Sequence, residues 1–199
     1  MCLDDAMAYL LRKLRDKNAW ANVMESPLWA PEDCPPEALW QVFDNRQSVS
    51  VWRVEGHEQI KRVIAAQAFL GKSIPNDFAY FLIDEHVLRD AGILLEDKPN
   101  PTFDREISQL HVNIVQITGK HLIKFAQLLN TQAESRVMTR SEILETAAIH
   151  FNNGLFDRAF LFEAKGNKGR SEEEIASSKA LLVSLWKKGA IDIALKKEQ

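Results

Sequence analysis

Two acidic residues, Asp84 and Glu85, directly follow the apolar run 78–83 (FAYFLI) and are the first candidates for chemistry. Paired carboxylates at the carboxyl end of a strand can bind a divalent cation or a substrate. Another carboxylate, such as that of Asp104, could share the cation. The same residues also suit a helix start, where Asp84 would cap the helix and Glu85 would complement its dipole. We favour the helix start, and the metal site is the alternative.

Other residue types that catalyse reactions or bind metals form no recognisable motif in this sequence. The five histidines lack the spacing that places two ligands on one helix face, and there is no Cys-x-x-Cys. The chain has no glycine-rich phosphate loop and no Gly-x-Ser-x-Gly elbow. Neither Cys2 nor Cys34 lies in a reactive context. We therefore predict no cofactor.

The triplet Glu163-Ala-Lys165, with Asp157 upstream, resembles the Glu-x-Lys motif of the restriction-endonuclease-like nucleases over residues 139–195. In that family an upstream acid and the glutamate hold a divalent metal, and the lysine positions or activates water. The resemblance implies a Mg²⁺-dependent nuclease with Asp157, Glu163 and Lys165 as catalytic residues. Two strands over residues 155–165 would favour this interpretation, and a helix there would exclude it.

Tryptophan and proline are concentrated near the start of the chain. Four of the five tryptophans lie within the first 52 residues, and four prolines lie between positions 27 and 36. Such closely spaced prolines exclude a helix or a central strand, so we expect a loop or an extended arm. Because tryptophan is enriched at interfaces, we predict that Trp20, Trp29 and Trp40 bind a partner. The alternative is that the arm buries its aromatic rings in its own domain.

Charge is distributed unevenly along the 199 residues, although the net charge is only −3. Residues 31–110 contain eight basic and fourteen acidic residues, a balance of −6. Residues 165–199 contain eight basic and five acidic residues, a balance of +3. The basic end is less dense than a typical phosphate-binding surface. A protein partner explains this polarity as well as nucleic acid does.

The hydrophobic periodicity predicts an α/β or α+β fold with a small sheet. Leucines at helical spacing predict an N-terminal helix over residues 3–24. The segment 48–92 predicts a βαβα unit, with strands at 48–55 and 78–83, and therefore two adjacent parallel strands joined by a right-handed crossover. Gly92 is expected to end the last helix of this unit.

The rest of the chain is predicted to be mainly helical. We expect a loop over residues 93–102 and a helix over residues 103–117, with a strand at 112–117 as the alternative. Thr118-Gly119 precedes another helix, and capping boxes at Thr139 and Ser171 predict two more. Three regions follow: an N-terminal helix and Trp/Pro arm (1–46), an α/β core (47–135) and a helical C-terminal region (136–199).

The sequence also suggests a compartment. No apolar run approaches the roughly 18 residues needed to cross a bilayer, and the N-terminal apolar stretch is too short for a signal peptide. Two cysteines are too few for a disulfide scaffold. We expect a cytoplasmic protein with no membrane partner.

Because a catalytic constellation is missing, the aromatic arm and the charge polarity carry the functional prediction. We predict a non-enzymatic protein–protein interaction module, an accessory subunit of a bacterial multi-protein complex. The metal-dependent nuclease is the alternative. A toxin–antitoxin or immunity component, in a defence system, is the second alternative.

Overall fold

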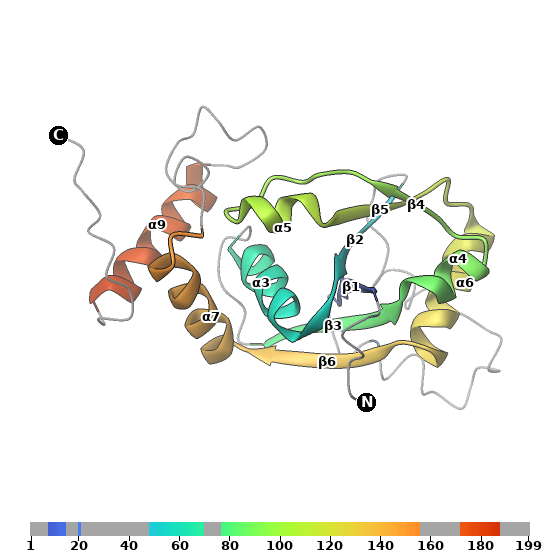
Figure 1. Cartoon of the computed structure of the whole chain (residues 1–199), viewed down its shortest axis with the longest axis horizontal. Helices are drawn as coiled ribbons and strands as arrows, with labels where there is room; N and C mark the ends of the chain where they lie inside the picture. Colours follow the sequence, from blue (N-terminus) through green and yellow to red (C-terminus); the bar gives the residue numbers. More distant parts are fainter. Residues whose placement is uncertain (1–7, 15–19, 21–47, 70–76, 156–171, 188–199) are drawn as a thin grey trace. The chain divides into compact units, whose positions relative to one another are not determined.

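The computed structural model describes residues 8–14, 20, 48–69, 77–155 and 172–187 (Figure 1). The strands are β1 (Tyr9–Lys13), β2 (Val49–Val54), β3 (Asp77–Asp84), β4 (Leu94–Asp97), β5 (His111–Val115) and β6 (Glu134–Thr139). The helices are α3 (Gly56–Ala68), α4 (Glu85–Asp90), α5 (Arg105–Gln109), α6 (Gly119–Thr131), α7 (Arg140–Asn152) and α9 (Glu172–Lys187). A sheet with several helices confirms the predicted α/β or α+β class.

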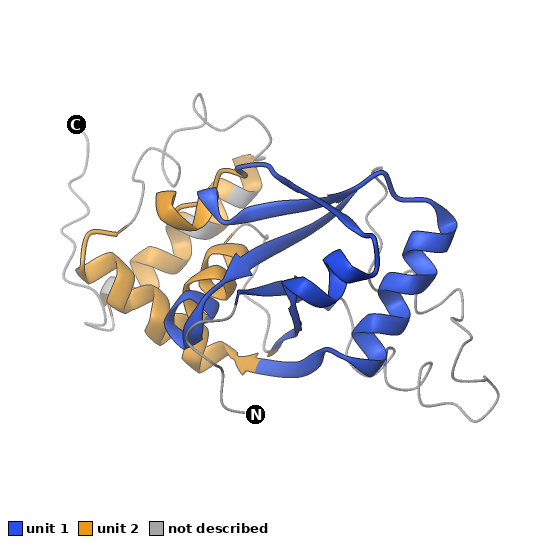
Figure 2. Cartoon of the chain, turned by 45° about the vertical axis from the view of Figure 1, so that its right-hand side comes forward, with its two compact units in different colours: residues 1–60, 78–99, 109–137 blue, residues 61–77, 100–108, 138–199 orange. Residues whose placement is uncertain are grey.

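The chain divides into two compact units, each assembled from segments far apart in the sequence (Figure 2). Unit 1 is drawn from residues 1–60, 78–99 and 109–137. Unit 2 is drawn from residues 61–77, 100–108 and 138–199. The three regions proposed from the sequence stay a prediction.

Six strands form one sheet in the order β4-β5-β2-β1-β3-β6. β1 is antiparallel to both neighbours, because Tyr9 pairs with Val54 of β2 and with Asp84 of β3. β5 is antiparallel to β2 and to β4, with Val112 opposite Val51 and Asp97. β1 and β2 therefore occupy the centre of the sheet, and β4 is one edge.

The helix predicted over residues 3–24 is wrong at residues 9–13, which form β1. All residues from Tyr9 to Arg12 are buried, as expected for a strand covered on both faces. Helix propensities differ by less than about 1 kcal/mol per residue between ordinary residues. Pairing with two strands and burial on both faces outweigh a preference of that size.

The predicted order of strand, helix, strand and helix over residues 48–92 is confirmed, but the predicted adjacency of the two strands is wrong. β1 lies between β2 and β3 and is antiparallel to both, so β2 and β3 run in the same direction one strand apart. This arrangement is a split βαβ unit. Local periodicity contains no information about a strand that enters from elsewhere in the sequence.

Two further predictions fail between residues 93 and 117. Leu94–Asp97 of the expected loop forms the edge strand β4. The expected helix over 103–117 is only α5, and His111–Val115 forms β5, in agreement with the alternative strand. The β-branched residues Val112 and Ile114 are fully buried between β2 and β4, where they suit a pleated strand better than a helix.

Within unit 1, one face of the sheet packs against α4 and α6. The strands contribute Leu10, Val49, Val51, Ala79, Phe81, Ile83, Val112 and Ile114, and the helices contribute Leu88, Phe125, Ala126, Leu128 and Leu129. The alternate residues of the central strands, including Leu11, Trp52 and Leu82, are buried as well. Burial on both faces explains the unbroken apolar run of β3.

Unit 2 is organised around aromatic rings and one buried ion pair. Phe69, Phe103 and Phe151 contact one another with ring centroids 5.2–5.7 Å apart. Asp104 is 1% exposed and accepts hydrogen bonds at 2.8–3.0 Å from the guanidinium of Arg62. The pairing satisfies a carboxylate that would otherwise be costly to bury.

His111 of β5 is a buried histidine held in one tautomer. Its Nδ1 donates to the Lys98 carbonyl oxygen, and its ring meets Trp52 edge-on with centroids 4.8 Å apart. Its Nε2 is buried and has no hydrogen-bond partner. Burial lowers the pKa of His111 below its usual value, which favours the neutral ring in the folded chain.

This histidine predicts a specific loss of stability in acid. Since the pKa is lower in the folded than in the unfolded chain, its contribution is intact above about pH 6.5 and declines as the pH falls further. We expect the free energy of unfolding, measured by urea titration at about pH 7.5 and about pH 5.5, to drop less in His111→Phe than in the unsubstituted chain. His57→Phe, at an exposed position, should retain the original drop, and an equal drop in both variants would contradict the assignment.

Candidate functional site

Asp84 joins β3 directly to α4 at the sheet end where β1 begins. Its Oδ1 accepts from the His86 backbone N–H at 2.8 Å, so the predicted helix cap is confirmed. The Glu85 N–H donates to the Ala8 carbonyl at 3.2 Å, which ties the start of α4 to the chain just before β1. The position of α4 is therefore fixed by two neighbouring strands.

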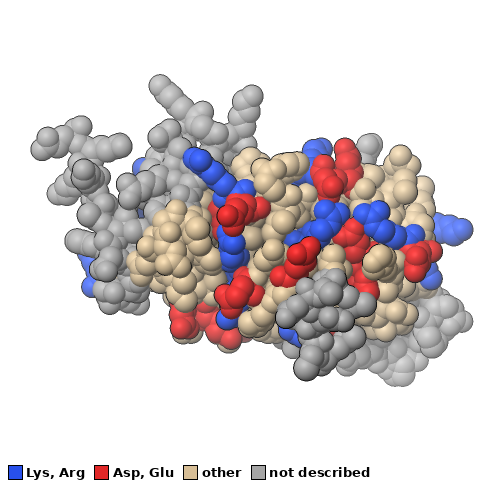
Figure 3. Space-filling view, viewed as in Figure 1, with Lys and Arg blue, Asp and Glu red and all other residues tan. Residues whose placement is uncertain are grey.

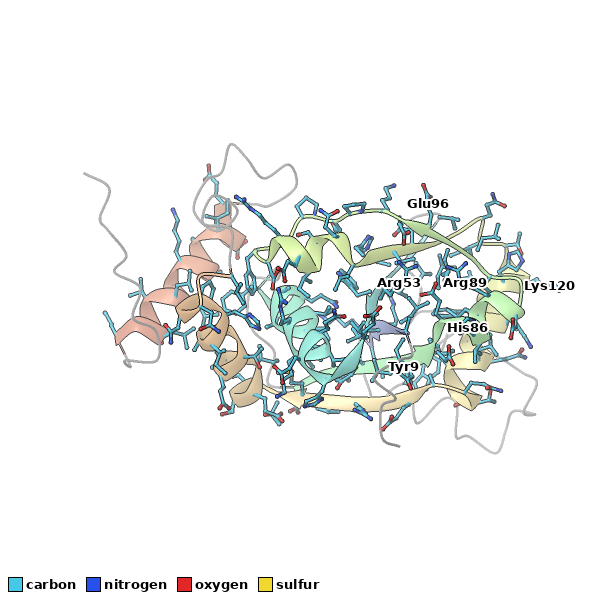
Figure 4. All side chains as sticks on the ribbon, viewed as in Figure 1. Tyr9, Arg53, His86, Arg89, Glu96 and Lys120 are labelled. Atoms are coloured by element: carbon cyan, nitrogen blue, oxygen red, sulfur yellow. The ribbon has the colours of Figure 1, made fainter. Side chains whose placement is uncertain are left out.

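Glu85 is the centre of a charged cluster with Arg53 and Arg89. Figure 4 labels the two arginines. Arg53 of β2 donates to Oε2 from Nε at 2.7 Å and to Oε1 from Nη2 at 3.2 Å. Arg89, one helical turn after Glu85, donates to Oε1 from Nε at 2.9 Å and also from Nη2. Glu85 is buried, while the side chains of Arg53 and Arg89 are 28% and 51% exposed.

The electrostatics of the cluster favour the charged forms of Glu85 and Arg53. Burial alone would raise the pKa of Glu85, but the hydrogen bonds from Arg53 and Arg89 outweigh it and leave the pKa below its usual value. The hydrogen bond to Glu85 likewise raises the pKa of Arg53, against the effect of burial. Arg53 also donates to Asp97 of β4 at 2.8 Å. Two cations and two anions compensate one another, which suits a structural clamp.

Arg53 and Arg89 are not among the predicted site residues, although the sequence contains two signals for them. Arg53 follows Val49 and Val51 in the alternation of β2, on the face that packs against α4 and α6. A charged residue at such a position requires a buried partner. The second signal is the four-residue spacing of Glu85 and Arg89, which places both on one helix face.

Basic and acidic side chains also lie next to one another over the face shown in Figure 3. Within the described ranges, no three metal-ligating side chains come together to form a cation site. The three carboxylates proposed as metal ligands all have other roles. Glu85 is bound by two arginines, Asp84 caps α4, and Asp104 is bound by Arg62. Each carboxylate therefore already has a structural partner.

A surface hollow lies between the end of α4 and the first turns of α6, with a volume of about 630 Å³. Ala91 and Gly92, just after α4, line one side, and Lys120, His121, Ile123, Lys124 and Gln127 line it from α6. Gly92 has a φ of +74°, a backbone conformation that residues with a side chain rarely adopt. It ends α4 as predicted. The turn after α4 thus forms one wall of the hollow.

The other wall is set by the start of α6. Thr118 and His121 form a reciprocal capping box, in which the Thr118 side chain accepts from the His121 N–H and His121 Nδ1 accepts from the Thr118 N–H. Ile117 and Leu122 flank the cap and pack against the core. These contacts fix which helix face carries Lys120, Ile123 and Lys124.

That face of α6 is unfavourable for helix stability in two ways, and it also exposes an isoleucine. Its first turn has no acidic residue, and Lys120 adds positive charge where the helix dipole is already positive. Lys120 and Lys124 are like charges four residues apart, which destabilises a helix. Between them Ile123 is 40% exposed. Natural sequences concentrate such conflicts at functional sites.

The remaining site predictions fall in two groups. Trp20 is 6% exposed and meets Phe81 edge-on, with ring centroids 5.0 Å apart, so this ring lies in the core. Trp29 and Trp40 lie outside the described residues. So do Asp157, Glu163 and Lys165, and with them the choice between helix and strand over 156–165.

No protein family, curated protein or solved structure matches this chain. In addition, none of the described helices combines the length and the apolar character needed to span a bilayer.

The cluster predicts unequal roles for the two acidic partners of Arg53. Replacing buried Glu85 by Gln removes the charge that two guanidinium groups share, and we expect a loss of about 2 kcal/mol in the free energy of unfolding. Asp97→Asn, at a side chain that is 68% exposed, should cost less than about 0.5 kcal/mol. Urea titrations of both variants measure the difference, and equal losses would show that Glu85 is not the centre of the cluster.

Proposed function

We propose that this chain is a non-enzymatic protein-interaction module, an accessory subunit of a multi-protein complex, which binds its partner at the α4–α6 hollow. The observation that carries the proposal is the exposed Ile123 among the residues that line this hollow. An isoleucine that is 40% exposed is unremarkable by itself, since folded surfaces are largely apolar. Here it adjoins a concave surface of about 630 Å³ and two exposed lysines, a combination suited to recognition.

The hollow is also held rigidly. On one side, Glu85 ties α4 to β2 through Arg53, and Leu88 of α4 is fully buried. On the other side, Phe125 and Leu129 anchor α6 in the core of unit 1. A binding surface supported in this way loses little conformational entropy on association, which favours affinity.

The chemistry of the described residues also favours binding over catalysis. The carboxylates of Glu85 and Asp104 are neutralised by arginines, and buried His111 has one ring nitrogen engaged by a backbone carbonyl. None of the three is an exposed acid, base or nucleophile next to the hollow. The residues that line it offer apolar contacts, two lysines and the polar side chains of His121 and Gln127.

Replacing Ile123 should abolish partner binding without unfolding the chain. We expect Ile123→Ser to lose a partner that the tagged chain retains when purified from its native cells, because the substitution removes the apolar contact at the hollow. Ile149→Ser is the matched control, since Ile149 is also a helical isoleucine and is 53% exposed. Reconstitution with the purified partner, followed by calorimetry, then measures the change in Kd. A partner that binds both variants equally would refute the α4–α6 hollow as the binding site.

The aromatic arm gives a second, separate prediction. If Trp29 and Trp40 contact the partner, Trp29→Ala and Trp40→Ala should each weaken binding at least about tenfold, as large interface aromatics do. Circular dichroism and urea titration should show that both variants still fold. If binding in the same assay is unchanged while folding is intact, the arm is not a binding element.

A further inference from the structure

We infer that the α4–α6 hollow binds an acidic peptide segment, one that presents two carboxylates about one helical turn apart and an apolar side chain beside them. This inference rests on the proposed function, because it names the partner chemistry of the same site.

Positive charge at the hollow comes from two lysines on one side of α6. Lys120 and Lys124 are both exposed, and four-residue spacing on a helix places their Cβ atoms about 6 Å apart. No ion pair joins either of them to a carboxylate among the residues that the structure describes. Both ammonium groups are therefore available to an anionic partner.

The opposite wall supplies no competing charge. Where α4 ends, the carbonyls of Val87, Leu88 and Arg89 each accept a hydrogen bond from the backbone that follows. These oxygens are therefore already satisfied. Ala91 and Gly92 add only small apolar surface. Asp90 is exposed nearby in sequence but is not among the lining residues.

The partial positive charge at the start of α6 adds to that of the lysines. The helix has thirteen residues, and its first turn contains no aspartate or glutamate to offset the dipole. Two lysines and a helix start would repel a basic segment and attract carboxylates. Ile123 lies between the lysines in sequence and is 40% exposed, so it can contact an apolar side chain of the same segment.

These features specify a ligand that can be synthesised. A helical segment with glutamates at positions i and i+4 matches the spacing of Lys120 and Lys124, and a leucine at i+3 would face Ile123. A pair of carboxylates alone would lack the apolar contact, and a neutral amphipathic helix would lack the charge. Both parts are required for specificity.

The test uses the full chain and two labelled synthetic peptides, one with the i, i+4 glutamate pair and leucine, the other with glutamines in place of the glutamates. Fluorescence anisotropy should show that the glutamate peptide binds about tenfold or more tightly than the glutamine peptide. The difference should shrink strongly between about 0.05 M and about 0.5 M salt, because both lysines are exposed.

Charge-matched variants identify the site. The double variant Lys120→Gln, Lys124→Gln should lose the preference for the glutamate peptide, whereas Lys98→Gln, Lys187→Gln, which removes two exposed positive charges elsewhere, should retain it. Equal binding of both peptides, absence of binding by both, or equal behaviour of the two double variants would overturn the inference. If the native partner is still lost in Ile123→Ser but not in the Lys120/Lys124 variant, the interaction module stands and only its acidic ligand is rejected.

Discussion

The insertion of β1 between β2 and β3 is the constraint on which the rest of unit 1 depends. Neighbouring strands lie about 4.8 Å apart, so β2 and β3 are separated by roughly 10 Å. Because Tyr9 pairs with both Val54 and Asp84, the ends of β2 and β3 lie at the same level of the sheet. Only a long side chain can bridge that distance, and Arg53 does so by reaching Glu85 at the start of α4. The ion pair is thus a consequence of the strand order.

The position of α4 then determines the surface. Arg53 and Arg89 hold Glu85 from two sides, and Leu88 is buried beneath the helix. Gly92 ends α4 beside the first turns of α6, which are fixed by the Thr118–His121 capping box. The exposed sides of α4 and α6 take no part in core packing. The side of α6 that carries Lys120, Ile123 and Lys124 is therefore free of packing constraints, and its unfavourable composition has no structural explanation within unit 1.

Local signals in the sequence predicted most elements whose formation is a local process. Asp84 and Thr139, both predicted as caps, each accept a hydrogen bond from the backbone of the helix that they start, because a cap involves only the next three residues. Thr118, which was not predicted as a cap, does the same for α6. The alternation of apolar residues in β2 and the apolar run of β3 are also local patterns, and they predicted both strands. Predictions failed for β1, β4 and β5, where pairing with distant strands decided the conformation. Leu10 and Leu11 suit a helix as well as a strand, and only their neighbours select between the two.

The candidate site divides in the same way. The sequence by itself favoured a helix cap at Asp84 and a helix end at Gly92, since both features depend only on residues close in sequence. The structure begins α6 at Gly119, so that Lys120, Ile123 and Lys124 share one helix face. The tertiary structure decided that Glu85 belongs to Arg53 and Arg89, that Trp20 contacts Phe81, and that the end of α4 and the start of α6 enclose a hollow. Each of these contacts joins elements distant in sequence. Their energies depend on burial and on distances of a few ångströms, which exist only once the strands have paired.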